Sequence, residues 1–221
     1  MSHADESGTE PTLSVVVPVY NDPRGIRMTL EAVAEQTYSS GRYEVLAVDN
    51  GSTDGTRELI RAFASFYDHV HLLVEDEVEG SYAARNEGIR HARGEIVSFI
   101  DADVTVEADW AESVVASYEE HGWDYMGCRV ELYIEKETLT AMYDRALGGF
   151  PVEQYMKERN FTGTGSLSIR RAVFDTVGTF DERIISQGDG EFGKRVHEAG
   201  FDQQFEPHIV MYHPARSGLR A

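Results

Sequence analysis

With 221 residues, the chain is long enough to bury a substantial core and to form one domain rather than two small ones. Its 39 aspartate and glutamate residues outnumber its 20 lysine and arginine residues, and the formal net charge of −19 excludes a groove that attracts nucleic-acid phosphates. Acids spread along the whole chain predict a halophilic protein that stays soluble in concentrated salt, with an ordinary acidic cytosolic protein as the alternative.

The first part of the chain predicts strands that alternate with helices. Residues 1–11 are polar and unpatterned, which favours a disordered lead-in before a single domain over residues 12–221. Short apolar runs predict strands at 13–20, 43–49, 70–74 and 95–100. In the two segments between the first three strands, apolar residues recur at intervals typical of a helix: Ile26, Leu30, Val33, Leu59, Phe63, Phe66 and Tyr67. This alternation is typical of βαβ units, so we expect a nucleotide-binding sheet with ligands at the carboxyl ends of its strands.

The second part of the chain is less regular. Beyond Trp123 the pattern predicts a strand, a helix, a glycine-rich passage, a helix and a final strand, at 123–134, 137–147, 161–169, 189–199 and 204–213. We therefore expect an α/β fold in which one mixed sheet is flanked by helices. A nucleotide half at about 12–105 and an acceptor half at 106–221 would share this sheet.

Cysteine usage and hydropathy indicate the compartment. Cys128 is the only cysteine, which excludes a disulfide framework within one chain and fits a reducing compartment. No stretch approaches the roughly 18 apolar residues of a spanning helix, and the first residues lack the apolar core of a signal peptide. We expect a cytoplasmic protein without a transmembrane segment, which could work at the cytoplasmic face of a membrane.

The most informative motif is a pair of acids that follows the fourth predicted strand, in IVSFIDADV. Positions i and i+2 of an extended chain face the same side, so Asp101 and Asp103 converge where such a sheet binds its ligand. Paired carboxylates there suit Mg²⁺ or Mn²⁺ that bridges a diphosphate. The alternative is that these acids cap the next helix, but Asp109 and Glu112 already supply a cap and its partner.

A second acid stands at the end of the second predicted strand, in LAVDNGSTDGT. A carboxylate at that edge can accept a hydrogen bond from a base N–H or a ribose hydroxyl, and we select Asp49 for this role. Turn and helix-capping chemistry is the better interpretation of Ser52, Thr53 and Asp54.

Over about residues 13–213 the sequence resembles family 2 glycosyltransferases, which have the GT-A fold. The matching segments stand in the family's order: SVVVPVYND, VDNGSTDGT, AARNEGIRHARGEIVSFIDADV and GSLSIRRAVFDTVGTFDE with GDGEFGKRVHEAG. Four segments in order are far more specific than any one of them. The third contains the approach to the DxD metal motif of that family.

The resemblance implies roles for individual residues. The backbone around Pro18 and Tyr20 would meet the base, with Asp49 on the uracil. Asp189 would be the catalytic base. Around the diphosphate, the implied residues are Asp101 near ribose and metal, Asp103 and His213 on the metal, and Arg85 and Arg216 as weaker candidates for the diphosphate itself.

Two departures from the family pattern leave alternatives open. The family usually has an acidic pair where this chain has Gly188 and Asp189, so Glu191 remains a rival base. Asn50 replaces a frequent second aspartate. Asp189 could also serve only as the N-cap of a helix, and His213 could be a surface histidine without a ligand. The Q-x-x-R-W motif of processive members is absent, which argues against polymer synthesis.

These features together predict an inverting, Mn²⁺- or Mg²⁺-dependent glycosyltransferase. Its donor would be a UDP- or GDP-sugar, and its acceptor a glycan, a protein or a polyprenyl-phosphate-linked group. A nucleotidyltransferase, a dinucleotide-dependent oxidoreductase and a P-loop enzyme each need a glycine-rich loop where this chain reads PVYNDPRG. A non-catalytic nucleotide-sugar-binding or assembly subunit is the alternative from another class, and retention of Asp189 beside the acid pair argues against it.

Overall fold

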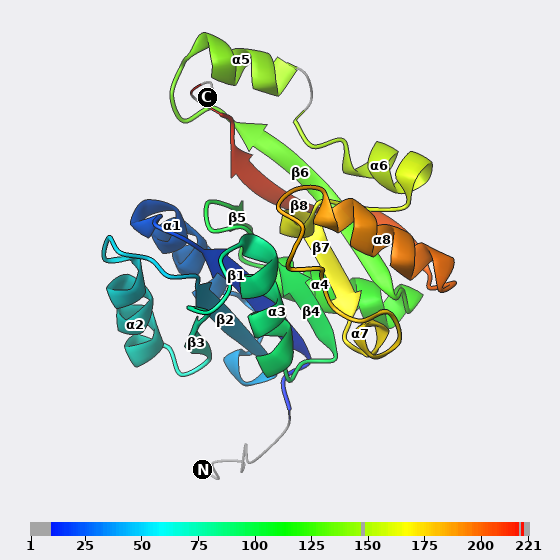
Figure 1. Cartoon of the computed structure of the whole chain (residues 1–221), viewed down its shortest axis with the longest axis horizontal. Coiled ribbons are helices and arrows are strands. Elements are labelled where there is room, and N and C mark those ends of the chain that lie inside the picture. The colour runs from blue at the N-terminus through cyan, green and yellow to red at the C-terminus, as the bar shows by residue number, and fades with distance from the viewer. Residues whose placement is uncertain (1–9, 147–148, 217, 219–221) are drawn as a thin grey trace.

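The computed structural model describes residues 10–146, 149–216 and 218. One eight-stranded sheet runs through this part of the chain, in the order β3-β2-β1-β4-β7-β6-β8-β5, with helices on both faces (Figure 1). The predicted fold class, α/β with a single mixed sheet, is therefore confirmed. Most of the expected N-terminal lead-in, residues 1–9, lies outside the described residues.

The N-terminal part of the sheet is parallel, as the alternation of strands and helices predicts. Its strands are β1 (Leu13–Val19), β2 (Tyr43–Asp49), β3 (Val70–Val74) and β4 (Ile96–Phe99). Every residue of β1, β2 and β4 is buried, because helices cover both faces of these central strands. Parallel alignment brings the carboxyl ends of the strands, where Asp49 and Asp101 follow, to one edge of the sheet.

The sheet divides the hydrophobic core into two layers, each covered by helices. Buried side chains of α1 (Pro23–Ala34), α2 (Thr56–Phe66) and α4 (Trp110–His121) pack on one face. Those of α3 (Ser81–His91), α6 (Val152–Arg159), α7 (Ala172–Val177) and α8 (Gly188–Glu198) pack on the other. Neighbours along β1 divide between the layers, since Val15 and Val17 belong to the first and Val16 to the second.

Two local predictions are wrong. Phe66 was expected in the apolar stripe of α2, but it is 78% exposed and Ile60 is the fully buried residue. Phe66 lies six positions after Ile60, a helical rotation of about 600°, which points Phe66 away from the sheet. Asp109 occupies the residue before α4, yet its side chain makes no capping hydrogen bond in the described structure.

The C-terminal half completes the sheet with mixed strand directions. It contributes β5 (Thr105–Val106), β6 (Tyr125–Tyr133), β7 (Leu167–Arg170), β8 (Gln203–Pro214) and α5 (Leu139–Ala146). β7 runs antiparallel between β4 and β6, whereas β6 and β8 are parallel to one another. Figure 1 shows β6 and β8 extending beyond the other strands toward α5. Leu147, the last residue of the helix expected there, is not among the described residues.

No helix in the described ranges is both long and apolar enough to span a bilayer.

Candidate active site

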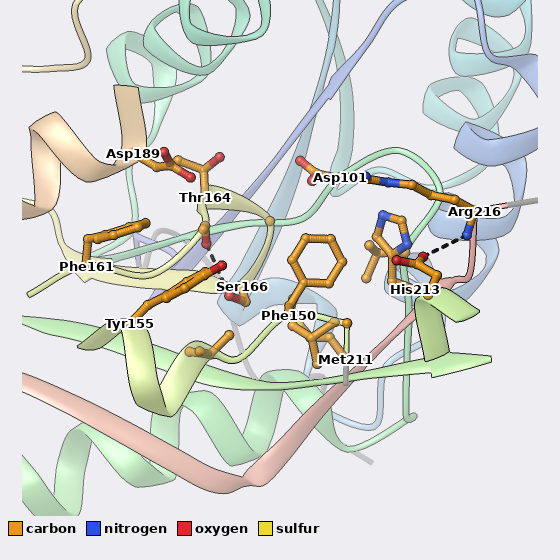
Figure 2. A pocket seen from close by; sticks show the side chains of 17 residues that line it. Asp101, Phe150, Tyr155, Phe161, Thr164, Ser166, Asp189, Met211, His213 and Arg216 are labelled. Carbon is orange, nitrogen blue, oxygen red and sulfur yellow. Dashed lines mark hydrogen bonds between the residues drawn. The ribbon is translucent and has the colours of Figure 1, made fainter. Parts of the chain in front are cut away.

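Two cavities open near the carboxyl ends of the parallel strands. The N-terminal cavity has a volume of about 450 Å³, and its lining residues are Pro18, Val19, Tyr20, Asn50, Glu79, Gly80, Ser81, Ala84 and Ile185. The C-terminal cavity has a volume of about 340 Å³ and is lined partly by polar residues, among them Asp101, Asp144, Asp189, His213 and Arg216 (Figure 2). Both volumes fall in the range of small-molecule sites.

Asn50 organises the wall of the N-terminal cavity. Its Nδ2 group donates to the carbonyl oxygens of Glu75 and Val78, at 2.9 and 2.8 Å, and its Oδ1 accepts from the Gly80 amide at 2.7 Å. These bonds fix the segment between β3 and α3, so that the first turn of α3 lies on the cavity. The cavity also contains Pro18 and Tyr20, the two residues expected near a base.

Asp49 lies behind this wall and is completely buried. Its Oδ2 accepts from Arg57 Nε at 2.7 Å, and Arg57 Nη2 also donates to Asp76 at 2.6 Å. Hydrogen bonds to Asp76 and Asp49 raise the pKa of the Arg57 guanidinium. Asp49 Oδ1 has no partner within the described structure. Arg57 is not among the site residues predicted from the sequence. An arginine in the first turn of a helix that follows an acidic turn could have indicated its ion pair with Asp49.

Asp101 lines the C-terminal cavity and pairs with Arg85. Both residues are expected near the diphosphate, and the structure places them side by side. Arg85 is buried, and its Nη2 donates to Asp101 Oδ1 at 2.6 Å. A Cβ atom at Gly165 would collide with the Asp101 carboxylate, so a larger residue there would displace the carboxylate that Arg85 holds. Helix α3 thereby connects the cavities, because Ala84 lines the first and the neighbouring Arg85 holds an acid of the second.

Asp103 faces His213 because β5 pairs antiparallel with β8. The register aligns Thr105 with Tyr212, and Asp103 Oδ1 lies 3.5 Å from His213 Nε2. Two ligands about 2.1 Å from one metal ion, at angles of about 90 to 110°, would be separated by roughly 3 to 3.5 Å. The pair therefore fits a shared divalent cation. Burial raises the pKa of Asp103, and the nearby His213 partly opposes this shift.

The three expected metal ligands are not assembled into one cluster. Among the described residues, no group of three or more His, Cys, Asp or Glu side chains is arranged to hold a metal ion. Asp103 and His213 form a pair, whereas Asp101 is engaged by Arg85. Thr29 Oγ1 donates to the Val104 carbonyl at 2.7 Å and so fixes the turn that carries both acids.

Asp189 lines the same cavity as Asp101 and His213, from the first turn of α8. Its backbone amide donates to Tyr82 Oη at 3.1 Å, and Gly188 packs so closely on the Tyr82 ring that a Cβ there would collide with it. Burial raises the pKa of the Asp189 carboxyl. The N-cap position belongs to Gln187, so Asp189 is not the N-cap of α8.

The rival base, Glu191, is engaged elsewhere. Its carboxylate forms an ion pair with Arg195 at 2.6 Å, and Arg195 also donates to the carbonyl oxygens of Val177 and Thr179. Glu191 does not line the C-terminal cavity. The geometry therefore favours Asp189 as the carboxylate that can meet a ligand.

Three aromatic side chains, which the sequence pattern does not predict as site residues, also line the C-terminal cavity: Phe150, Tyr155 and Phe161. Figure 2 shows Phe150 between the Asp189 side and the His213 side of the cavity. Tyr155 and Phe161 stack with ring centroids 5.3 Å apart. Arg216 lines the rim, and its backbone amide donates to Asp144 at 3.0 Å.

Comparison with known proteins assigns the family. The model of glycosyl transferase family 2 matches residues 14–180, more than half of the chain. Glycosyltransferase AglE of Haloferax volcanii is 40% identical over 211 residues, an alignment that covers 95% of this chain and 69% of AglE.

Solved structures share the fold at low sequence identity. The S. aureus TarS 1-349 structure in complex with UDP-GlcNAc has a TM-score of 0.76 at 21% identity, covering 94% of this chain and 60% of that one. The mannosyltransferase PcManGT of Pyrobaculum calidifontis, in complex with GDP-Man and Mn²⁺, has a TM-score of 0.73 at 24% identity, covering 95% and 58%. The fold is GT-A, and the chain belongs to glycosyl transferase family 2.

Proposed function

We propose that the chain transfers a sugar from a nucleoside-diphosphate sugar to an acceptor hydroxyl, with inversion at the anomeric carbon. The observation that carries this proposal is the position of Asp189 on one cavity with Asp101, while Arg85 on the adjoining helix connects Asp101 to the wall of a second cavity. A base, a charged strand end and a place for a nucleotide are thus neighbours.

The N-terminal cavity would take the nucleoside. Tyr20 offers an aromatic face and the Pro18 backbone lies on the same cavity, while Asn50 fixes the wall through its bonds to the segment before α3. Buried Asp49, which the resemblance places on the uracil, lines neither cavity, and with Arg57 it would support this wall from behind. UDP- and GDP-sugars are the proposed donors, because TarS binds UDP-GlcNAc and PcManGT binds GDP-Man.

Asp103 and His213 would hold a divalent cation, with Asp101 as a further candidate ligand. Mn²⁺ or Mg²⁺ would suit these oxygen and nitrogen donors, and PcManGT contains Mn²⁺. When bound, the ion would offset negative charge on the departing diphosphate. Arg85 and Arg216 would add positive charge beside the same group.

In the chemical step, Asp189 would accept the proton of the acceptor hydroxyl. The hydroxyl oxygen then bonds to the anomeric carbon from one face, while the bond to the diphosphate oxygen breaks on the other and leaves its electrons on that oxygen. The raised pKa of Asp189 brings this carboxylate closer to the operating pH, which favours proton acceptance.

A neutral hydroxyl fits the C-terminal cavity better than a phosphate does. Three carboxylates line this cavity, of which Asp101 is paired with Arg85, and Arg216 is the one arginine among the described residues that line it; the remaining excess of negative charge disfavours an anionic acceptor. We therefore place a hydroxyl of a glycan or a protein first. A polyprenyl phosphate would need little help from a base, and a non-catalytic subunit would need none.

Donor turnover tests the proposed function. Purified protein in molar KCl is incubated with a panel of UDP- and GDP-sugars and Mn²⁺, and released nucleotide is measured with and without excess chelator. We expect metal-dependent release that Asp103→Ala reduces by roughly 10² or more, while Asp109→Ala, on the exposed turn before α4, leaves it unchanged. Full turnover in excess chelator would refute the metal assignment. The absence of turnover with every donor would refute the proposed enzymatic activity.

A further inference from the structure

One aromatic side chain of the C-terminal cavity is exposed. Phe150, Tyr155 and Phe161 all line this cavity, and of the three only Phe150 is exposed, at 37%. Its ring stands between the Asp189 side and the His213 side of the cavity (Figure 2). An exposed phenyl ring contributes little to the stability of the fold, so its position in a cavity points to a contact with the molecule that the cavity binds.

The other two rings are used in packing. Tyr155 stacks on Phe161, with the ring centroids 5.3 Å apart and the planes inclined by 14°, and the Arg159 guanidinium lies over the Tyr155 ring at 5.4 Å from its centroid. Phe161 also lies against α8, where a Cβ atom at Gly193 would collide with it and one at Gly190 would touch its ring. These contacts join α6 to α8 and leave Phe150 as the ring that a ligand can cover.

The backbone fixes the position of Phe150 before any ligand binds. Gly149 has φ of +58°, in the left-handed region that favours glycine, and lies against the Leu132 side chain of β6. Pro151 follows and restricts the backbone of the preceding Phe150 to extended conformations. The Val152 amide donates to the Phe150 carbonyl at 2.9 Å. A ring held in this way loses little conformational entropy when a ligand stacks on it.

Polar groups surround this ring. The Asp144 and Asp189 carboxylates line the same cavity, and the Arg216 amide donates to Asp144 at 3.0 Å. Carboxylate oxygens accept hydrogen bonds from hydroxyl groups. A pyranose has the complementary surface, with hydroxyls around its rim and C–H groups on the faces of its ring. A serine or threonine side chain presents at most a methyl group, which is too small to cover a phenyl ring.

We propose that the C-terminal cavity takes a neutral pyranose as the acceptor, with Phe150 stacked on the C–H face of this sugar and the acceptor hydroxyl directed to Asp189. This inference rests on the proposed function and deepens it, because it selects a glycan over a protein side chain. The excess of carboxylates on the cavity favours a neutral sugar over a uronic acid. Phe150 is then an acceptor-binding residue that determines specificity.

Saturation-transfer NMR on the full chain tests the class of acceptor. The probes are methyl β-D-glucopyranoside, methyl α-D-mannopyranoside and a peptide that contains serine and threonine, each with Mn²⁺ and UDP or GDP present. We expect saturation of the C–H protons of at least one glycoside and none of the peptide. In the glucoside, H1, H3 and H5 share one face of the ring and H2 and H4 the other, so stacking predicts unequal saturation of the two sets.

Kinetics of transfer to the glycoside with the strongest saturation test Phe150 itself. Phe150→Leu keeps an apolar side chain but removes the flat ring, so we expect it to raise the KM for the glycoside about 3- to 10-fold. The value of kcat, and the rate of nucleotide release with water as acceptor, should stay within about 2-fold of the wild type. Phe150→Tyr keeps the ring and should retain the wild-type KM.

Phe66→Leu is the matched control, because Phe66 is 78% exposed on α2 and lines neither cavity. It should leave the KM unchanged, and Tm should stay near the wild-type value in all three variants. Equal KM values for Phe150→Leu and Phe66→Leu, a raised KM for the donor in Phe150→Leu, or saturation of no glycoside would overturn the acceptor assignment while nucleotide release leaves the proposed function standing. A wild type that releases nucleotide from no donor would overturn the proposed function itself.

Discussion

The two cavities differ in how the chain builds them. The N-terminal cavity is formed by the ends of neighbouring parallel strands and the start of α3, with Ile185 as the one distant contribution. The C-terminal cavity draws on segments from Asp101 to Arg216 that meet only because β7 and β8 enter the sheet beside the first half. A cavity of the first kind follows from local pattern, and one of the second kind depends on long-range packing.

The cavities differ in charge as well. The N-terminal cavity is lined by one carboxylate, that of Glu79, and otherwise by uncharged residues. The C-terminal cavity collects three carboxylates, His213 and Arg216. Substitutions in the first should therefore change nucleotide affinity, whereas those in the second should change the rate of transfer. The predictions below test this division.

The largest effect is expected from Asp189→Asn. Asparagine keeps the shape of the side chain but cannot accept the proton of a hydroxyl acceptor, so the transfer rate should fall by roughly 10²–10⁴. Nucleotide affinity should stay within about 2-fold, as measured by calorimetry. Near-normal transfer to a verified hydroxyl acceptor would mean that another group is the base.

Glu191→Gln is the control for that variant, because Arg195 holds this carboxylate away from the cavity. It should retain most of the activity.

The pH profile of the wild type gives a further check. Since burial raises the pKa of Asp189, kcat/KM should fall on the acid side at a pH above the pKa of an ordinary aspartate. A charged carboxylate with a raised pKa also costs folding stability, so Asp189→Asn should raise Tm near neutral pH, and the gain should disappear as the pH falls toward about 4.

A smaller effect, on stability, is expected behind the N-terminal cavity. Arg57→Ala leaves the buried Asp49 carboxylate without its charged partner, and unfolding free energy should fall by about 2–3 kcal/mol, less than for a fully buried pair because Arg57 is partly exposed. Urea unfolding measures the change. Arg61→Ala, whose ion pair with Glu58 is exposed and 3.8 Å long, should change stability by less than about 0.5 kcal/mol.

The double variant Arg57→Ala, Asp49→Asn separates this pair from simple loss of packing. Removal of the buried charge should restore part of the stability lost in Arg57→Ala. A double variant that is less stable than the sum of the two single losses would contradict the ion-pair explanation.

The smallest effect is a shift of the whole molecule with salt. A net charge of −19 repels itself, and the Debye length of about 3 Å at 1 M salt screens most of that repulsion. Tm should rise by several degrees between dilute buffer and molar KCl, with most of the rise in the first few hundred millimolar, where screening changes fastest. A flat or falling Tm would count against salt adaptation.

The sequence alone determined the alternation of strands and helices in the first half and the acids at the strand ends, because backbone periodicity and turn chemistry are local, whereas β5, α6, β7 and α7 were not predicted. β2 and β3 coincide with the predicted segments, and α8 begins within one residue of its prediction. The same pattern could not tell which acid at an edge faces a cavity. Asp49 and Asn50 are neighbours, yet one is buried against Arg57 and the other lines the cavity wall.

Only the tertiary structure decided those matters, because they depend on partners far along the chain. The β5–β8 register brings Asp103 to His213. The ion pair with Arg195 holds the Glu191 carboxylate away from the cavity that Asp189 lines. The local pattern does not show that Tyr155 and Ile185 line cavities, because their positions on those cavities depend on segments far along the chain. Local spacing fixes where a side chain leaves the backbone, and packing between distant segments fixes what it meets.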